Sequence, residues 1–307
     1  MGKGINLLII FLILVTAFCL FTLKPVNKSS LISPKLSGKV LGISQWFPKE
    51  ALGLQDNAPQ ISAQGAIFID TRDGKILFSK NPNQRLPIAS LVKVMSVLVA
   101  LEHKNMEDLY TISQRAAEAE PDKMLLIAGE KLTLKELLDG IFLVSANDAA
   151  EAIAEGTTGS REEFIKQMND QAKFLGLKDT FYANPTGLDE DSGNSYSSAY
   201  DLAILTRFLI RKYPEVVDIS STEHIVLPQT QTHQDYDMYS GINLLTSYPG
   251  VVGFKTGYTP EAGLTLITLA RKNGHEVLGI LLGSGDRRDE ARELLDYSFK
   301  KLGIKVD

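Results

Sequence analysis

Cysteine is almost absent from this 307-residue sequence, and that scarcity excludes several classes of protein. The single cysteine, Cys19, lies inside an apolar run, so one chain can form neither a disulfide framework nor a cysteine-based metal cluster. Only four histidines occur, at positions 103, 224, 233 and 275, and none has the H-x-x-x-H spacing of a metal site. We therefore expect no metal or organic cofactor.

An excess of basic charge is also missing. The chain carries 32 Lys and Arg residues against 37 Asp and Glu residues, for a net charge of −5 and a pI of about 5.5. This balance provides no basic field for binding a polyanion, so the sequence predicts no nucleic-acid partner. A hydrophobic fraction of 44% with 22% charged residues is ordinary for a globular protein.

The N-terminus departs from that composition. Residues 5–23 carry no charge and would span about 28 Å as a helix, enough to cross the apolar core of a bilayer. Phe18, Cys19 and Phe21 crowd the end of the run, where a cleavable signal peptide needs small residues. We therefore favour an uncleaved single-pass anchor over residues 1–23, with a cleaved signal peptide as the alternative.

The remainder divides into a tether and a folded domain. Residues 24–60 contain scattered prolines and serines without a sustained period, and they predict a flexible tether before a domain at 61–307. Two short apolar runs flank Asp73-Gly74, which indicates a β-hairpin. Helical periodicity and capping signals then predict helices, and Asn273-Gly274 marks a second hairpin before a last amphipathic helix. The expected helical segments are 132–156, 160–176, 201–213 and 288–302.

The order of these elements predicts a fold class. Strands open and close the domain, and helices occupy the middle, which favours an α+β fold over alternating α/β. We expect one antiparallel sheet formed by the N- and C-terminal strands, flanked by helices, with an inserted helical region.

The segment "IASLVKVMS" places Ser90 and Lys93 three residues apart in apolar surroundings. On a helix the two side chains lie on one face, and burial lowers a lysine pKa, so the amine can take the serine proton. The alternative is that Lys93 extends to solvent while Ser90 only caps the helix. S-x-x-K is too common to decide between these interpretations.

Two later motifs favour the catalytic interpretation. Ser145-Ala146-Asn147 and Lys255-Thr256-Gly257 follow in order, and together with Ser90-x-x-Lys93 they match the signature of penicillin-binding proteins and class A β-lactamases. Ser145 could pass a proton to a leaving amine, and the Asn147 amide could orient the lysine. Each alone could be a cap or turn residue.

The third motif has its own chemistry. Lys255 would attract a substrate carboxylate and, as a second cation, depress the pKa of the first lysine. Gly257 would let a substrate backbone approach closely, and the backbone N–H groups of Ser90 and Tyr258 are candidate oxyanion donors. We expect this motif where a strand begins, and the alternatives are a surface lysine at that strand start and a β-bulge or turn glycine.

The chain resembles the serine-type D-alanyl-D-alanine carboxypeptidases, the low-molecular-weight penicillin-binding proteins with a β-lactamase/transpeptidase-like fold. The resemblance covers roughly residues 60–300 and includes "FLVSANDAAEAIAE", "FYANPTGL", "GFKTGYTPEAGLTLITLA" and "LLDYSF". It implies hydrolysis of peptidoglycan stem peptides that end in D-Ala-D-Ala, covalent inhibition by β-lactams, and an extracytoplasmic domain on the cell membrane. Many family members also carry a C-terminal β-rich domain and helix, neither of which fits the residues before Asp307.

The resemblance also assigns roles. It implies that Ser90 is acylated, that Lys93 is the base and that Ser145 is the third catalytic group. The substrate-binding residues would be Asn147, Lys255, Thr256, Gly257, Tyr258 and Arg287, with Arg288 as the reserve for the carboxylate-binding arginine.

Three alternatives are open. The same motifs would suit a DD-endopeptidase that cuts cross-links. A class A β-lactamase needs a deacylating glutamate, and residues 145–255 present no clear Glu-x-x-x-Asn. A non-catalytic peptidoglycan-binding module would be expected to have lost a polar motif residue, and none is lost.

Overall fold

The computed structural model describes residues 57–190 and 193–306, all within one compact unit, Trp46–Asp307. The predicted anchor at 1–23 and nearly all of the predicted tether at 24–60 lie outside the described residues. Within the described part, none of the helices has the length and apolar character needed to cross a bilayer.

A five-stranded antiparallel sheet forms the centre of the fold, in the order β2-β1-β11-β10-β9. The first strand of the domain pairs with the last, from Gly65 opposite Leu282 to Asp70 opposite Val277, so the predicted sheet of N- and C-terminal strands is confirmed. The strands are β1 (Gly65–Asp70), β2 (Ile76–Lys80), β9 (Val251–Thr259), β10 (Gly263–Lys272) and β11 (His275–Ser284).

Both predicted hairpins are present. Asn273 and Gly274 have φ angles of 49° and 77°, the left-handed conformation that a tight two-residue turn between β10 and β11 requires. Three small two-stranded sheets were not predicted, because their strands have only two to four residues. These are β3 (Leu86–Pro87) with β6 (Tyr196–Ser197), β4 (Leu109–Thr111) with β5 (Lys131–Thr133), and β7 (His224–Leu227) with β8 (Tyr236–Tyr239).

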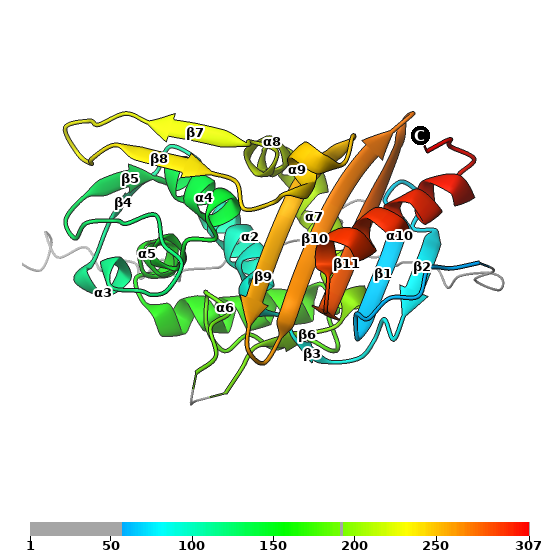
Figure 1. The fold of residues 1–307 in the computed structure, drawn as a ribbon. Coiled ribbons are helices and arrows are strands. Elements are labelled where there is room, and N and C mark those ends of the chain that lie inside the picture. Colours follow the sequence, from blue (N-terminus) through cyan, green and yellow to red (C-terminus); the bar gives the residue numbers. More distant parts are fainter. Residues whose placement is uncertain (1–56, 191–192, 307) are drawn as a thin grey trace, which may run out of the picture. The chain divides into compact units, whose positions relative to one another are not determined.

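Helices cover both faces of the sheet (Figure 1). The C-terminal helix α10 (Arg287–Lys301) packs on β10, β11, β1 and β2, and its buried Leu294, Leu295 and Phe299 join the core cluster on that face. The helices α7 (Ala199–Lys212) and α8 (Glu215–Ser220) contact strands of the same sheet. Burial of such apolar faces is the main contribution that holds the layers together.

The inserted helical region was predicted, but one of its helices is in fact two. The segment 132–156 divides into α4 (Leu134–Leu143) and α5 (Asn147–Thr158), because Ser145 has a φ of 60° that no helix tolerates. The region also contains η1 (Ala89–Val92), α2 (Lys93–His103), α3 (Gln114–Ala117) and α6 (Arg161–Phe174), and α9 (Leu244–Ser247) precedes β9.

Candidate active site

Ser90 lies in the 3₁₀ turn η1, directly before α2. The Lys93 Nζ donates a hydrogen bond to Ser90 Oγ at 2.9 Å. Lys93 is 0% exposed, and neither η1 nor α2 has a serine cap, so the alternative of a solvent-exposed lysine and a capping serine is wrong. The serine hydroxyl and the amine therefore meet in a water-poor environment, as the sequence predicts.

Two further acceptors hold the Lys93 amine. It donates to Asn147 Oδ1 at 2.7 Å and to the Thr186 carbonyl at 2.8 Å. Burial lowers the pKa of Lys93 to about 7, against the opposing effect of nearby carboxylates, Asp122 foremost. Near neutral pH a large fraction of the amine is therefore unprotonated and able to accept a proton.

The second motif occupies the break between α4 and α5. Ser145 stands in the left-handed region, outside both helices, while Asn147 begins α5. The backbone N–H of Asn147 donates to the Asp122 carbonyl at 2.7 Å, and its Nδ2 donates to the Glu120 carbonyl at 3.2 Å. The Asn147 amide is thus fixed with its oxygen toward Lys93.

The third motif lies in the middle of β9, not at the start of a strand as expected. The Lys255 side chain is 1% exposed, and its Nζ donates to Ser145 Oγ at 2.8 Å and to the Thr256 carbonyl at 2.7 Å. Burial, the charge of Lys93 and the charge of Arg287 hold the pKa of Lys255 well below its usual range. Two lysines, two serines and an asparagine therefore form a cluster drawn from η1, α2, α5 and β9 and the α4–α5 break.

Strand β9 is the edge of the sheet and passes closely by the Ser90 turn. A Cβ placed on Gly257 would come within 2.9 Å of the Ser90 nitrogen and 2.6 Å of Thr265 Oγ1, so glycine is required for this approach. Tyr258, the next residue, is 62% exposed. In an edge strand, every second backbone N–H points away from the neighbouring strand and is free to bind a ligand. The N–H of Tyr258 in β9 and the N–H of Ser90 in the adjacent turn remain the predicted oxyanion donors.

The two candidate arginines differ clearly. Arg287 Nη1 donates to the carbonyls of Gly257 at 2.6 Å and Thr265 at 3.2 Å, which places its charge against β9 and β10. Arg288 is exposed and pairs with Asp289 at 3.1 Å. The geometry favours Arg287 over Arg288 for an effect on the site, and its contact with substrate stays a prediction.

Sequence reasoning assigned no role to the loop that carries Thr186, or to Asp122. Asn184 Oδ1 accepts hydrogen bonds from the backbone N–H groups of Thr186 and Gly187, at 3.2 and 2.6 Å, and so shapes the loop behind Ser90. A Cβ on Gly187 would come within 2.0 Å of the Ala89 carbonyl oxygen. The segment "NPTG" shows the chemistry of a tight turn, but the position of that turn beside Lys93 is a tertiary feature.

Curated proteins similar to this chain include two carboxypeptidases. D-alanyl-D-alanine carboxypeptidase DacF of Bacillus subtilis is 38% identical over 247 residues, which cover 78% of this chain and 62% of the relative. D-alanyl-D-alanine carboxypeptidase DacB2 of Mycobacterium tuberculosis is 30% identical, and the match covers 78% of this chain and 84% of that protein. The chain thus spans about three fifths of the length of the Bacillus relative.

Solved structures agree with these relatives. The crystal structure of the Streptomyces K15 DD-transpeptidase matches with a TM-score of 0.74 and 29% identity, over 79% of this chain and 99% of that one. A D-alanyl-D-alanine carboxypeptidase from Mycobacterium tuberculosis matches with a TM-score of 0.74 and 29% identity, over 83% and 96%. Residues 53–285 match the family described as D-alanyl-D-alanine carboxypeptidase, and the chain therefore belongs to that family.

Proposed function

We propose that this chain is a serine DD-peptidase that removes the terminal D-alanine from peptidoglycan stem peptides. The observation that carries the proposal is the buried contact of Lys93 Nζ with Ser90 Oγ at 2.9 Å. Family membership supports the same reaction.

Acylation follows from this contact. Ser90 Oγ attacks the carbonyl carbon between the two D-alanines, and its proton passes to the unprotonated Lys93 amine. The backbone N–H groups of Ser90 and Tyr258 stabilise the negative charge that develops on the carbonyl oxygen. Ser145, which is hydrogen-bonded to Lys255, helps to deliver a proton to the departing amine of the terminal D-alanine.

Substrate binding uses the exposed edge of β9. A peptide in extended conformation can add to an edge strand through backbone hydrogen bonds. The free carboxylate of the terminal D-alanine is then attracted by the positive charges of Lys255 and Arg287, and Asn147 and Thr256 provide polar contacts beside it. Water finally hydrolyses the ester on Ser90 and returns the proton to the serine.

The β-lactamase alternative has less support. Among residues 57–190 and 193–306, no carboxylate oxygen is hydrogen-bonded to Ser90, Lys93 or Ser145. A carboxylate that activates water for rapid deacylation would be needed for fast turnover of a β-lactam.

A labelled penicillin tests the nucleophile, because a β-lactam presents a strained amide and a carboxylate to the same groups. Wild-type protein should form a lasting adduct on the peptide that contains Ser90, and Ser90→Ala should form none. Labelling that survives in the variant would refute the assignment, and rapid release of hydrolysed drug would favour a β-lactamase.

The balance between carboxypeptidase and endopeptidase action needs a second assay. Wild-type protein is incubated with a pentapeptide ending in D-Ala-D-Ala and, separately, with a cross-linked dimer of stem peptides. The products are identified by mass spectrometry. Release of one alanine from the pentapeptide with an intact dimer supports the carboxypeptidase. Cleavage of the dimer alone supports the endopeptidase.

We also propose that residues 5–23 anchor the enzyme in the cell membrane with the catalytic domain on the extracytoplasmic side. The support is the uncharged length of this run and the position of the substrate outside the cytoplasm. Intact-mass analysis of membrane-extracted protein should give the uncleaved chain. A mature N-terminus beyond residue 17 would show a cleaved signal peptide instead.

A further inference from the structure

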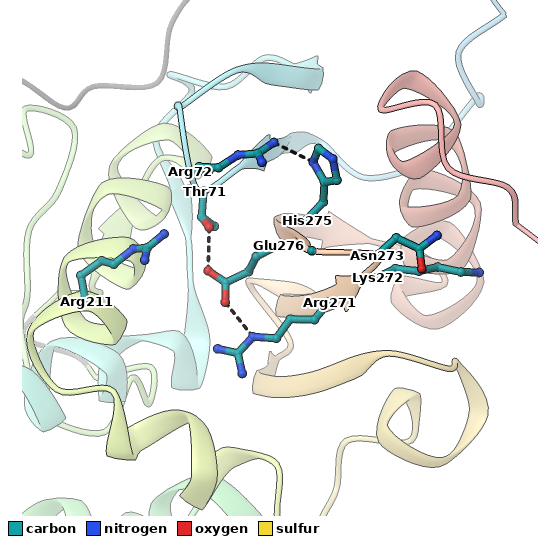
Figure 2. Close-up of a pocket in the computed structure, with 9 residues that line it drawn as sticks. Thr71, Arg72, Arg211, Arg271, Lys272, Asn273, His275 and Glu276 are labelled. Carbon is teal, nitrogen blue, oxygen red and sulfur yellow. Dashed lines mark hydrogen bonds and ion pairs between the residues drawn. The ribbon is translucent and has the colours of Figure 1, made fainter.

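A cavity lies at the hairpin end of β10 and β11, with a volume of about 480 Å³ (Figure 2). Its lining comes from three parts of the chain: the turn after β1, the last turn of α7 and the β10–β11 hairpin. All of its side chains are polar, and four are cationic against one carboxylate. The lining residues are Thr71, Arg72, Arg211, Arg271, Lys272, Asn273, Gly274, His275 and Glu276.

The carboxylates near this cavity already have partners. Glu276 accepts hydrogen bonds from Thr71 Oγ1 at 2.6 Å and from Arg271 Nε at 2.8 Å. The buried Asp70 pairs with Arg72 at 3.2 Å and with His275 at 3.0 Å. Among the described residues, Arg211 and Lys272 have no carboxylate partner, so the cavity keeps uncompensated positive charge.

Helix α7 adds a like-charge pair at this point. Arg207 and Arg211 are four residues apart and so lie on one face of the helix, an arrangement that destabilises a helix on its own. The Arg207 Nε donates to the Thr71 carbonyl at 2.7 Å, which holds its charge close to the cavity. Burial and the neighbouring charge of Arg211 lower the pKa of Arg207 to about 10. An anion beside Arg211 would relieve this repulsion.

Size, polarity and charge together define the ligand class. The cavity has the volume of a small-molecule site, and its lining consists of polar side chains and one glycine, with no aliphatic residue among them. Arginine guanidinium groups match phosphate oxygens in geometry, and Arg271 uses only its Nε in the pair with Glu276. We propose that this cavity binds the phosphate group of a small polar phosphate ester, with Arg211 and Arg271 as the principal ligands.

The cavity is separate from the active site. Thr265, which accompanies Gly257 beside the Ser90 turn, is seven residues along β10 from Lys272, and this separation corresponds to about 23 Å of extended strand. Loss of phosphate binding should therefore leave acylation by penicillin unchanged, and failure of one proposal is distinguishable from failure of the other.

Isothermal titration calorimetry of the full-length protein, purified in detergent, tests the proposal. The titrants are inorganic phosphate and glycerol 3-phosphate, at constant ionic strength set with chloride. Wild type should bind glycerol 3-phosphate saturably. Arg211→Gln should weaken this binding at least tenfold, and Arg211→Lys should restore part of it. Arg85→Gln is the matched control, because Arg85 is an exposed arginine paired with Asp179 elsewhere on the surface.

Vesicles distinguish the source of the phosphate. Binding to phosphatidylglycerol vesicles, but not to phosphatidylcholine vesicles, that is lost in Arg211→Gln and kept in Arg85→Gln would support a lipid headgroup. Saturable binding of glycerol 3-phosphate without vesicle binding would support a soluble ester. The proposal is overturned if neither probe binds, or if Arg211→Gln and Arg85→Gln weaken binding equally.

Discussion

The two cationic regions of this molecule differ chiefly in their contact with water. Lys93 and Lys255 are almost completely buried, and burial lowers the pKa of each. At the other end of the sheet, Arg211 and Arg271 are exposed around an open cavity. A cation without water becomes a group that can lose and regain a proton, whereas an exposed guanidinium keeps its charge and can only attract an anion.

This difference explains why lysine and arginine are not interchangeable between the two regions. Proton transfer needs an amine whose pKa can fall to the working pH, and only lysine provides it. Anion binding needs a permanent charge with several donors, which arginine provides. The following experiments test this contrast, from the largest expected effect to the smallest.

Replacing the base should have the largest effect. Lys93→Arg keeps a charge but cannot be deprotonated near neutral pH, so the acylation rate should fall by about 10²- to 10⁴-fold, the usual contribution of a general base. Stopped-flow measurement with a fluorescent penicillin gives this rate. Because a guanidinium is larger than an ammonium group and Lys93 is fully buried, Lys93→Met serves as a second variant of similar length. Near-normal acylation by the folded Met variant would show that Lys93 is not the base.

The close approach of β9 to the Ser90 turn can be broken by one methyl group. Gly257→Ala places a Cβ 2.9 Å from the Ser90 nitrogen, which must displace one of the predicted oxyanion donors. We expect acylation to slow by about a hundredfold, as when one oxyanion donor is lost. Gly241→Ala is the control, since its nearest atom would be 3.6 Å away. Equal rates for both variants would remove Gly257 from the proposed mechanism.

Local signals in the sequence predict much of this fold. The turns at Asp73-Gly74 and Asn273-Gly274 predict both hairpins, and apolar periodicity predicts α7 and α10 within about two residues at each end. The same periodicity runs through Ser145 and predicts one helix where two exist. The strained φ of Ser145 is stabilised by tertiary contacts, so a periodic pattern cannot reveal it.

The contacts of the active site also divide into those that a local sequence pattern predicts and those that only the tertiary fold creates. The spacing of Ser90 and Lys93 is a local signal, and the structure brings the two side chains into the expected contact. The Thr186 carbonyl and Asp122 reach Lys93 only through folding, over 93 and 29 positions of sequence, and no local pattern predicts them. The cationic cavity is lined by three segments that are far apart in the sequence, so no local pattern predicts it either.

Lys255 and Arg287 can be separated by the charge of the substrate. Lys255→Met should lower kcat/KM on a pentapeptide by about 10- to 100-fold, because it removes a charge-assisted hydrogen bond worth roughly 1.5–3 kcal/mol. The loss should be smaller on the C-terminal amide, which lacks the carboxylate. Since the pKa of Lys255 is lowered, its charge is lost as the pH rises, and the wild-type KM for the free acid should increase with pH.

The same comparison of the free acid with the C-terminal amide tests Arg287, whose guanidinium already donates hydrogen bonds to two backbone carbonyls. Arg287→Ala should also lose more activity on the free acid than on the amide if it contacts the carboxylate. An equal loss on both substrates would make Arg287 a residue that only holds β9 against β10, and Arg288→Ala would then be measured.

Asp122 should change the pKa of Lys93 without contacting the reacting groups. Its side chain is exposed, and among the charges near Lys93 it has the largest opposing effect on the lowered pKa. Asp122→Asn removes a charge that favours the ammonium form, so the pKa of Lys93 should fall further and the acidic limb of the kcat/KM profile should move to lower pH. High salt should move the wild-type limb in the same direction, because exposed charges are screened. Asp73→Asn, in the distant β1–β2 turn, should leave the limb in place. If Asp122→Asn also leaves it there, the acidic limb does not report Lys93, and the assignment of that lysine as the titrating base is wrong.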